Sequence, residues 1–93
     1  MGLAKEPEVL SLDPLHIADV VEDLNRIGRA TGTEAKAAEI TQGLTARIEA
    51  VAERAKDVDK HPSVLHVEWA DPVMCGGHWV PEMVDLAGGT NSF

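Results

Sequence analysis

The pattern of apolar and polar positions divides the chain of 93 residues into extended and helical segments. Residues 15–28 carry apolar side chains at every third or fourth position, which predicts an amphipathic helix that stops at Gly28. Residues 33–58 continue this spacing for longer, with helix-favouring Ala, Glu, Lys, Arg and Gln at the remaining positions. Thr33 stands where an N-cap is expected, and Gly43 is the one weak point inside the second helix. The pattern therefore predicts one short helix followed by a rigid helix of about 38 Å.

Two extended segments flank this pair of helices. Residues 8–12 (EVLSL) form a strand candidate, and residues 64–69 (VLHVEW) form a better one. Strict alternation in the second segment places Leu65, Val67 and Trp69 on one face of the strand. An Asp-Pro pair follows each segment and ends it, because the residue before proline is held outside the helical conformation.

The last third of the chain continues with a loop and a short helix. Residues 73–77 (VMCGG) are expected to be a loop, and residues 80–87 a helix that stops at a Gly-Gly pair. The predicted order is strand, helix, long helix, strand, helix, which is typical of an α/β protein with its function at the carboxyl ends of the strands. Because two strands do not make a parallel sheet, we expect this chain to be a part of a larger α/β protein.

Composition narrows the possible functions. Aromatic residues make up only 3% of the chain, so a core built from Ala, Val, Leu and Ile would be thin and would need a partner or a larger body to complete it. The net charge of −8 argues against nucleic acid and against anionic lipid as partners. A single cysteine excludes an intrachain disulfide and a zinc site made of several cysteines. No apolar run reaches the roughly 18 residues of a membrane span, and the first residues lack the apolar segment of a signal peptide.

Three short motifs occupy the carboxyl-terminal third of the chain: E-W-x-D-P at 68–72, G-H-W-V-P-E at 77–82 and A-G-G-x-N at 87–91. Together they resemble the substrate-binding proteins of ABC importers for vitamin B12 and iron–siderophore complexes. Residues 9–40 look like the last strand and helix of this family's amino-terminal lobe, followed by the start of its linking helix. The resemblance covers roughly Pro7 to Phe93.

The resemblance implies a fold class: an α/β fragment of a two-lobe periplasmic binding protein with one long linking helix. Residues 1–32 would end the amino-terminal lobe, residues 33–60 would be the linking helix, and residues 61–93 would begin the carboxyl-terminal lobe. The family implies a non-enzymatic transport protein with ABC importer membrane subunits as partners. It also implies a periplasmic or lipid-anchored extracytoplasmic location for the parent protein. The ligand would be cobalamin or a ferric siderophore, with no covalently bound cofactor.

Seven residues are candidates for contact with such a ligand: Glu68, Trp69, Asp71, Met74, Gly77, His78 and Trp79. Tryptophan planes suit a broad and partly apolar chelate, and methionine is an adaptable contact. Glycine before a helix allows a close backbone approach, and histidine can donate a hydrogen bond or ligate a metal. Each position also has a structural interpretation: core packing for the tryptophans and the methionine, turn formation for the aspartate and the glycine, and a structural role for the histidine and the glutamate.

An alternative of a different class remains open. The long helix could dimerise a helical interaction protein that has no small-molecule ligand, and two copies of this chain could cover the apolar faces left bare. No Ser-His-Asp, paired-carboxylate or Walker-type arrangement stands out, so we predict no catalytic residues and no metal site. Cys75 is expected to be a small buried residue, because no base partner is evident from the spacing.

Overall fold

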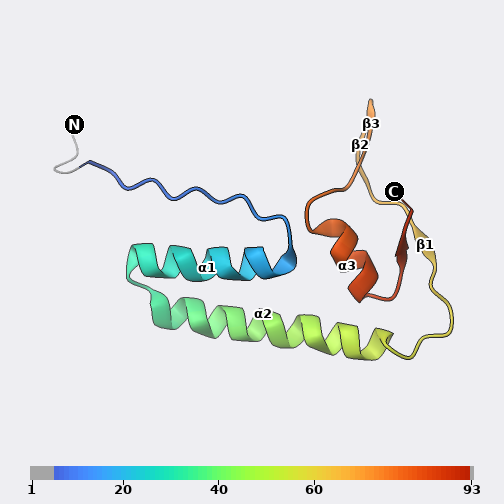
Figure 1. Cartoon of the computed structure of the whole chain (residues 1–93), viewed down its shortest axis with the longest axis horizontal. Helices are drawn as coiled ribbons and strands as arrows, with labels where there is room; N and C mark the ends of the chain where they lie inside the picture. The colour runs from blue at the N-terminus through green and yellow to red at the C-terminus, as the bar shows by residue number, and fades with distance from the viewer. Residues whose placement is uncertain (1–5, 93) are drawn as a thin grey trace.

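The computed structural model describes residues 6–92. Residues 1–5 of the predicted first region (1–32) and Phe93 of the predicted third region (61–93) lie outside the described part. The described residues form three helices and four short strands (Figure 1). In chain order these are α1 (Ile17–Thr31), α2 (Glu34–Ala55), β1 (Ser63–Val64), β2 (Val67–Ala70), β3 (Val73–Cys75), α3 (Val80–Leu86) and β4 (Thr90–Asn91). The fold is therefore mixed α/β.

Helices α1 and α2 lie side by side and are joined by a two-residue turn (Figure 1). The turn begins at Gly32, whose φ of 72° is left-handed and whose N–H is donated to the Gly28 carbonyl. The prediction that α1 stops at Gly28 is wrong, because this residue lies buried inside the helix. A Cβ atom on Gly28 would lie 2.5 Å from the Cβ of Ala37, so the missing side chain lets the two helices approach each other.

The long helix predicted from the sequence is confirmed as one unbroken element. Helix α2 has 22 residues, which corresponds to about 33 Å, and it ends at Ala55 instead of Val58. Ala37 and Thr41 are buried where α1 covers α2, whereas Ile40 and Val51 are exposed. The apolar row of α2 is thus only partly covered within the described residues.

The predicted strand at residues 8–12 is wrong. This segment runs extended beside α1 and forms no strand, with Val9 left 90% exposed (Figure 1). A strand requires a neighbour whose backbone groups can pair with its own, and the described residues place none beside this segment. The apolar character of the segment was therefore misleading without knowledge of its partner.

The single strand predicted at residues 64–69 is also wrong, because the segment is divided between two sheets. Strand β1 pairs in parallel with β4, in the register Ser63↔Thr90 and Val64↔Asn91. The side-chain hydroxyls of Ser63 and Ser92 also bond to each other across this pair. Together with α3, the two strands form a small parallel β-α-β unit into which the remaining two strands are inserted.

The inserted strands β2 and β3 form an antiparallel hairpin, so the expected loop at residues 73–77 is in fact largely a returning strand. Val67 pairs with Cys75, whereas Trp69 pairs with the adjacent Met74. Paired residues share a face and adjacent residues do not, so Val67 and Trp69 lie on opposite faces of the hairpin. The predicted common face is therefore wrong, because Glu68 is an extra residue that forms a β-bulge.

The described structure is flat and open. It measures 58 × 36 × 15 Å and has a radius of gyration of 17.6 Å, whereas a compact domain of this length has about 12 Å. The accessible surface is 7482 Å², compared with roughly 5,200 Å² for a compact protein of this mass. No described side chain is fully buried. None of the helices among residues 6–92 combines the length and the apolar character needed to cross a membrane.

Candidate ligand-binding site

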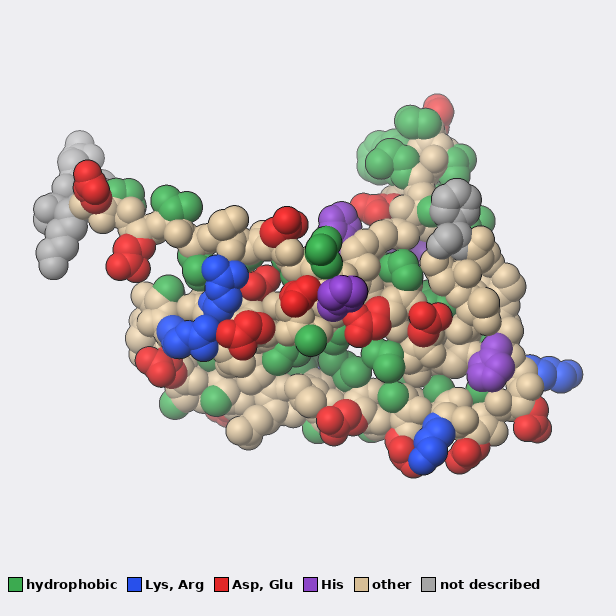
Figure 2. All heavy atoms as spheres, in the orientation of Figure 1, with side chains coloured by type: hydrophobic (Ala, Val, Ile, Leu, Met, Phe, Trp, Pro, Cys, Tyr) green, Lys and Arg blue, Asp and Glu red, His purple; other side chains and the backbone are tan. Residues whose placement is uncertain are grey.

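The β2–β3 hairpin projects from the body of the molecule, and hydrophobic side chains gather on it (Figures 1 and 2). Trp69 and Met74 are directly paired across the two strands, so their side chains share one face. Trp69 is 62% exposed and Met74 is 52% exposed. On the opposite face, Ala70 pairs with Val73, which is 68% exposed. The hairpin therefore presents apolar side chains to the surroundings on both of its faces.

The two strands are joined at Asp71 and Pro72, whose peptide bond is cis. The indole Nε1–H of Trp69 donates a hydrogen bond of 2.9 Å to the main-chain carbonyl of Asp71. This bond holds the edge of the indole on the turn and satisfies its one polar group, so the faces of the ring remain available for apolar contact. The carboxylates of Glu68 and Asp71 are exposed on either side of Trp69 in the chain.

The base of the hairpin is closed by a backbone bond, because the Gly76 N–H donates to the His66 carbonyl at 2.8 Å. A Cβ atom on Gly76 would overlap the imidazole of the exposed His66 side chain, so a larger residue here would require that imidazole to move. Cys75, expected to be buried, is half-buried at this base. The close packing fixes where the hairpin leaves the body.

The remaining candidate residues lie between the hairpin and α3. Gly77 is half-buried, and its carbonyl accepts the Val80 N–H at 3.1 Å. His78 is exposed and has a φ of 57°, a left-handed conformation that is uncommon for a residue with a side chain. Trp79 is half-buried at the N-cap of α3, and its ring centroid lies 5.9 Å from that of His78, with the planes tilted by 57°. The structure thus divides the seven candidates into a hairpin group and a loop group.

A contact that the sequence did not reveal ties α3 to α1. The Glu82 carboxylate accepts a hydrogen bond of 2.9 Å from the Ile17 N–H, although 65 positions separate the two residues. This N–H belongs to the first turn of α1 and has no partner within its own helix. The same carboxylate lies 3.8 Å from the His16 Nδ1. Glu82 therefore satisfies the start of α1 from another part of the chain and connects the first turn of α3 to it.

The start of α1 is also stabilised from within. The Asp19 carboxylate accepts hydrogen bonds from the Leu15 N–H at 3.1 Å and from the His16 N–H at 3.0 Å. These two backbone donors lower the pKa of Asp19 below its ordinary value of 3.8. The ionised form of Asp19 is therefore the form that the fold favours.

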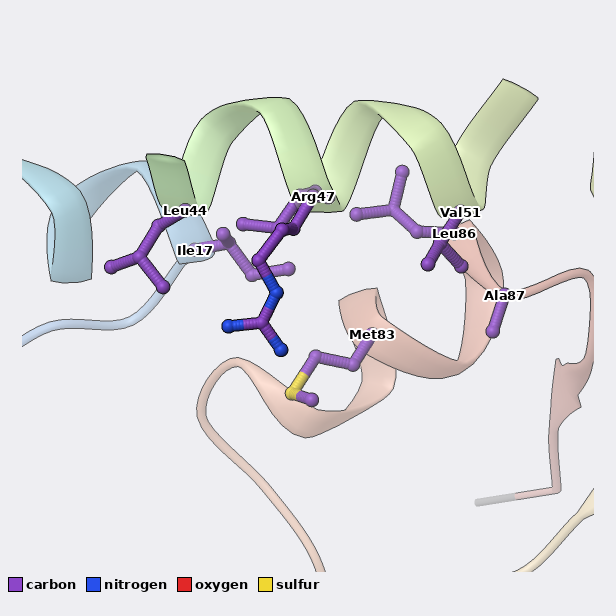
Figure 3. Close-up of a pocket in the computed structure, with 8 residues that line it drawn as sticks. Ile17, Leu44, Arg47, Val51, Met83, Leu86 and Ala87 are labelled. Carbon is purple, nitrogen blue, oxygen red and sulfur yellow. The ribbon is translucent and has the colours of Figure 1, made fainter. Parts of the chain in front are cut away.

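A hollow of about 350 Å³, open to solvent, lies between helices α1, α2 and α3. Its lining is mostly apolar and comes from the three helices and the C-cap of α3: Ile17, Leu44, Arg47, Ile48, Val51, Met83, Leu86 and Ala87 (Figure 3). The sequence signal for this hollow was the apolar row of α2, which continues past the part that α1 covers. Within residues 6–92, no three His, Cys, Asp or Glu side chains are grouped so that they could hold a metal ion.

The combination of a short helix on a long one, followed by a parallel β-α-β unit with an inserted hairpin, occurs in part of a known mixed α/β fold. One solved structure that this chain resembles is that of IsdE from S. aureus, which was crystallised in complex with heme; the TM-score is 0.73 and the sequence identity is 20%. The likeness covers 88% of this chain and 32% of the IsdE chain, so this chain spans about one third of IsdE. No family model matches the sequence, and no curated protein matches it either.

Proposed function

We propose that this chain is part of the substrate-binding component of an ABC importer, and that its ligand is a metal chelate such as cobalamin or an iron–siderophore complex. Residues 1–32 are then the end of one lobe, residues 33–60 the linking helix and residues 61–93 the start of the second lobe. Two observations support the proposal: the motifs at 68–72, 77–82 and 87–91, and the likeness in fold to a protein crystallised with heme, itself an iron chelate. The ABC importer membrane subunits are the corresponding partners.

The observation that carries the proposal is the exposed apolar face of the hairpin. Trp69 and Met74 are each more than half exposed, although transfer of aromatic and thioether side chains out of water is favourable. A chelate with a broad, partly apolar surface is large enough to cover both side chains together. Glu68 and Asp71 then offer hydrogen-bond acceptors at the edge of the ligand. Gly77, His78 and Trp79 extend the same wall towards α3.

Ligand binding can be tested on the full chain by thermal unfolding with cyanocobalamin or a ferric hydroxamate. A ligand that binds only the folded state raises the unfolding free energy by about 2.7 kcal/mol at 100 times its Kd. The double variant Trp69→Ala with Met74→Ala should lose this increase. The matched control, Val9→Ala with Leu12→Ala, removes exposed apolar side chains elsewhere and should keep it. If neither chelate stabilises the unaltered chain at saturating concentration, the proposal is wrong.

A second candidate is a dimer that forms through α2 and binds no small molecule. It is favoured by the exposure of Ile40 and Val51 on the apolar row of this helix. Sedimentation equilibrium separates the two candidates. A dimer that is disrupted by Ile40→Asp and shows no stabilisation by any chelate would support the second candidate over the first.

A further inference from the structure

The motif at residues 77–82 ends in Glu82, which is not one of the seven candidate ligand contacts. An acidic residue in the first turn of a helix is usually explained by its attraction to the free N–H groups of that same helix. The Glu82 carboxylate instead accepts the Ile17 N–H of α1 at 2.9 Å and lies 3.8 Å from the His16 Nδ1. This last residue of the motif therefore has a role that ligand contact does not explain.

The described chain consists of two units with an exposed link between them (Figure 1). Helices α1 and α2 form the first unit, which is tightly packed where Gly28 meets Ala37. Residues 61–92 form the second unit, in which α3 lies between the paired strands β1 and β4 in the sequence. The link, residues 56–60, is exposed along its whole length and contains no helix or strand. The covalent connection therefore does not fix how the two units are oriented.

Apolar contacts also join the two units, but they form an incomplete interface. A Cβ atom on Gly88, just after α3, would lie 3.2 Å from the Cβ of Ala55 at the end of α2. Beyond this contact lies the open hollow, which Met83 and Leu86 line from α3 (Figure 3). Apolar attraction has no preferred direction, whereas a hydrogen bond requires a narrow range of distance and angle. The bond to Glu82 thus supplies the direction that the apolar contacts lack.

We infer that Glu82 is a positioning residue, whose carboxylate fixes the angle between the α1–α2 unit and the unit of residues 61–92. The hairpin is positioned by the same bond, because backbone hydrogen bonds connect the first turn of α3 to the preceding loop and to the base of the hairpin. These bonds run from the Met83 N–H to the Trp79 carbonyl at 3.1 Å, from the Val80 N–H to the Gly77 carbonyl at 3.1 Å, and from the Gly76 N–H to the His66 carbonyl at 2.8 Å. The description of the two units as two lobes rests on the proposed function, but the positioning does not.

Distance measurements between pairs of nitroxide labels, by pulsed electron paramagnetic resonance, test this inference on the full chain without a ligand. The native thiol is removed by Cys75→Ser. Labels at Ala30→Cys on α1 and Val73→Cys on the hairpin then report the arrangement of the two units, and both positions are exposed. Labels at Val73→Cys and Thr90→Cys report the second unit alone. With Glu82 present, we expect a single narrow distance distribution for each pair.

Glu82→Ala should widen the distribution between the units at least about twofold and leave the distribution within the second unit unchanged, because only the directional contact is lost. Glu82→Gln keeps an acceptor oxygen and should keep the narrow distribution between the units. The matched control is Asp85→Ala, which removes an exposed carboxylate from the same helix and should also keep it.

Three results would overturn the inference: a broad distribution between the units in the original chain, an unchanged one in Glu82→Ala, or a widening of both pairs. The last result would mean that Glu82 only stabilises α3. Each of these results leaves the proposed function in place, because no chelate takes part. If no chelate stabilises the chain, the proposed function fails and the units are no longer two lobes, but the positioning by Glu82 stands.

Discussion

The α1–α2 pair and the β2–β3 hairpin are both built from two elements joined by a two-residue turn, yet they place their apolar side chains differently. In the helical pair, Ala37 is buried against α1, and Gly28 makes the close approach possible. In the hairpin, Trp69 and Val73 are mostly exposed. The helical pair buries the small residues at its contact and leaves Ile40 and Val51 exposed, whereas the hairpin buries none of its large apolar side chains.

This difference indicates what each region is for. Burial of apolar surface stabilises a fold by about 25 cal/mol per Å². The exposed apolar side chains of the hairpin therefore contribute little to the stability of the described fold. Contiguous exposed apolar surface in proteins marks contact sites for ligands or partners. The hairpin, held at its base by the bond between Gly76 and His66, exposes the larger apolar side chains and is therefore the region that we propose contacts a ligand.

The largest expected effect tests the helical side of this comparison. Gly28→Val would place side-chain atoms where Ala37 already lies, so we expect a loss of about 3 kcal/mol of unfolding free energy. Gly43→Ala is the matched control, because an added Cβ there meets nothing within 4 Å. It should instead stabilise the chain by about 1 kcal/mol through helix propensity. Urea unfolding measures both, and a Gly28→Val variant as stable as the original would show that α1 and α2 do not touch at this point.

A smaller effect tests the connection between the two regions. Glu82→Ala removes the acceptor of the Ile17 N–H, and we expect a loss of about 1–2 kcal/mol. Glu82→Gln keeps an acceptor oxygen and should lose less, and Asp85→Asn on the same helix serves as the control. Faster hydrogen exchange of the Ile17 amide in Glu82→Ala would locate the effect, whereas an unchanged exchange rate would exclude this contact in solution.

A still smaller effect concerns the dependence of stability on pH. Asp19 has a lowered pKa in the folded chain, because the Leu15 and His16 N–H groups donate to its carboxylate. Its contribution is therefore complete above the ordinary pKa of 3.8 and is lost as the pH falls through the lower folded value. Asp19→Asn should be less stable than the original chain at pH 6, and the difference should shrink towards pH 2. A difference that is constant with pH would contradict this account.

The smallest effect on stability is expected in the hairpin. Trp69→Ala should change the unfolding free energy by no more than about 0.5 kcal/mol, because the indole is mostly exposed. The same substitution should abolish most of the stabilisation by a bound chelate. A loss of several kcal/mol in the absence of ligand would mean that Trp69 belongs to the core, and the contrast between the two regions would disappear.

The sequence predicted the elements whose signals are local. Helix α2 follows from a periodicity written within its own residues, and it forms as one unbroken helix. The strand at residues 8–12 could not be judged in the same way, because a strand depends on a partner elsewhere. Likewise, Gly28 was predicted to end a helix, because its contact with Ala37 of the second helix has no signal in the neighbouring sequence.

The candidate site was predicted in part for the same reason. The motifs named the candidate residues, which remain a prediction, but the bulge at Glu68 and the return of β3 depend on pairing between strands, which alternation alone does not specify. The bond from Ile17 to Glu82 joins residues 65 positions apart and has no local signal. A helix start that lacks an internal partner was the one indication that such an acceptor had to exist.

Acrylamide quenching of Trp69 tests the central claim most directly, in a Trp79→Phe variant that leaves Trp69 as the only indole. If the hairpin holds its apolar face ready for a ligand, acrylamide should quench Trp69 nearly as well as a free indole in water, and saturating cyanocobalamin should protect it. Lifetime measurements separate this protection from absorption of light by the chelate. An indole that is already shielded without ligand, or one that stays equally accessible with it, would contradict the account.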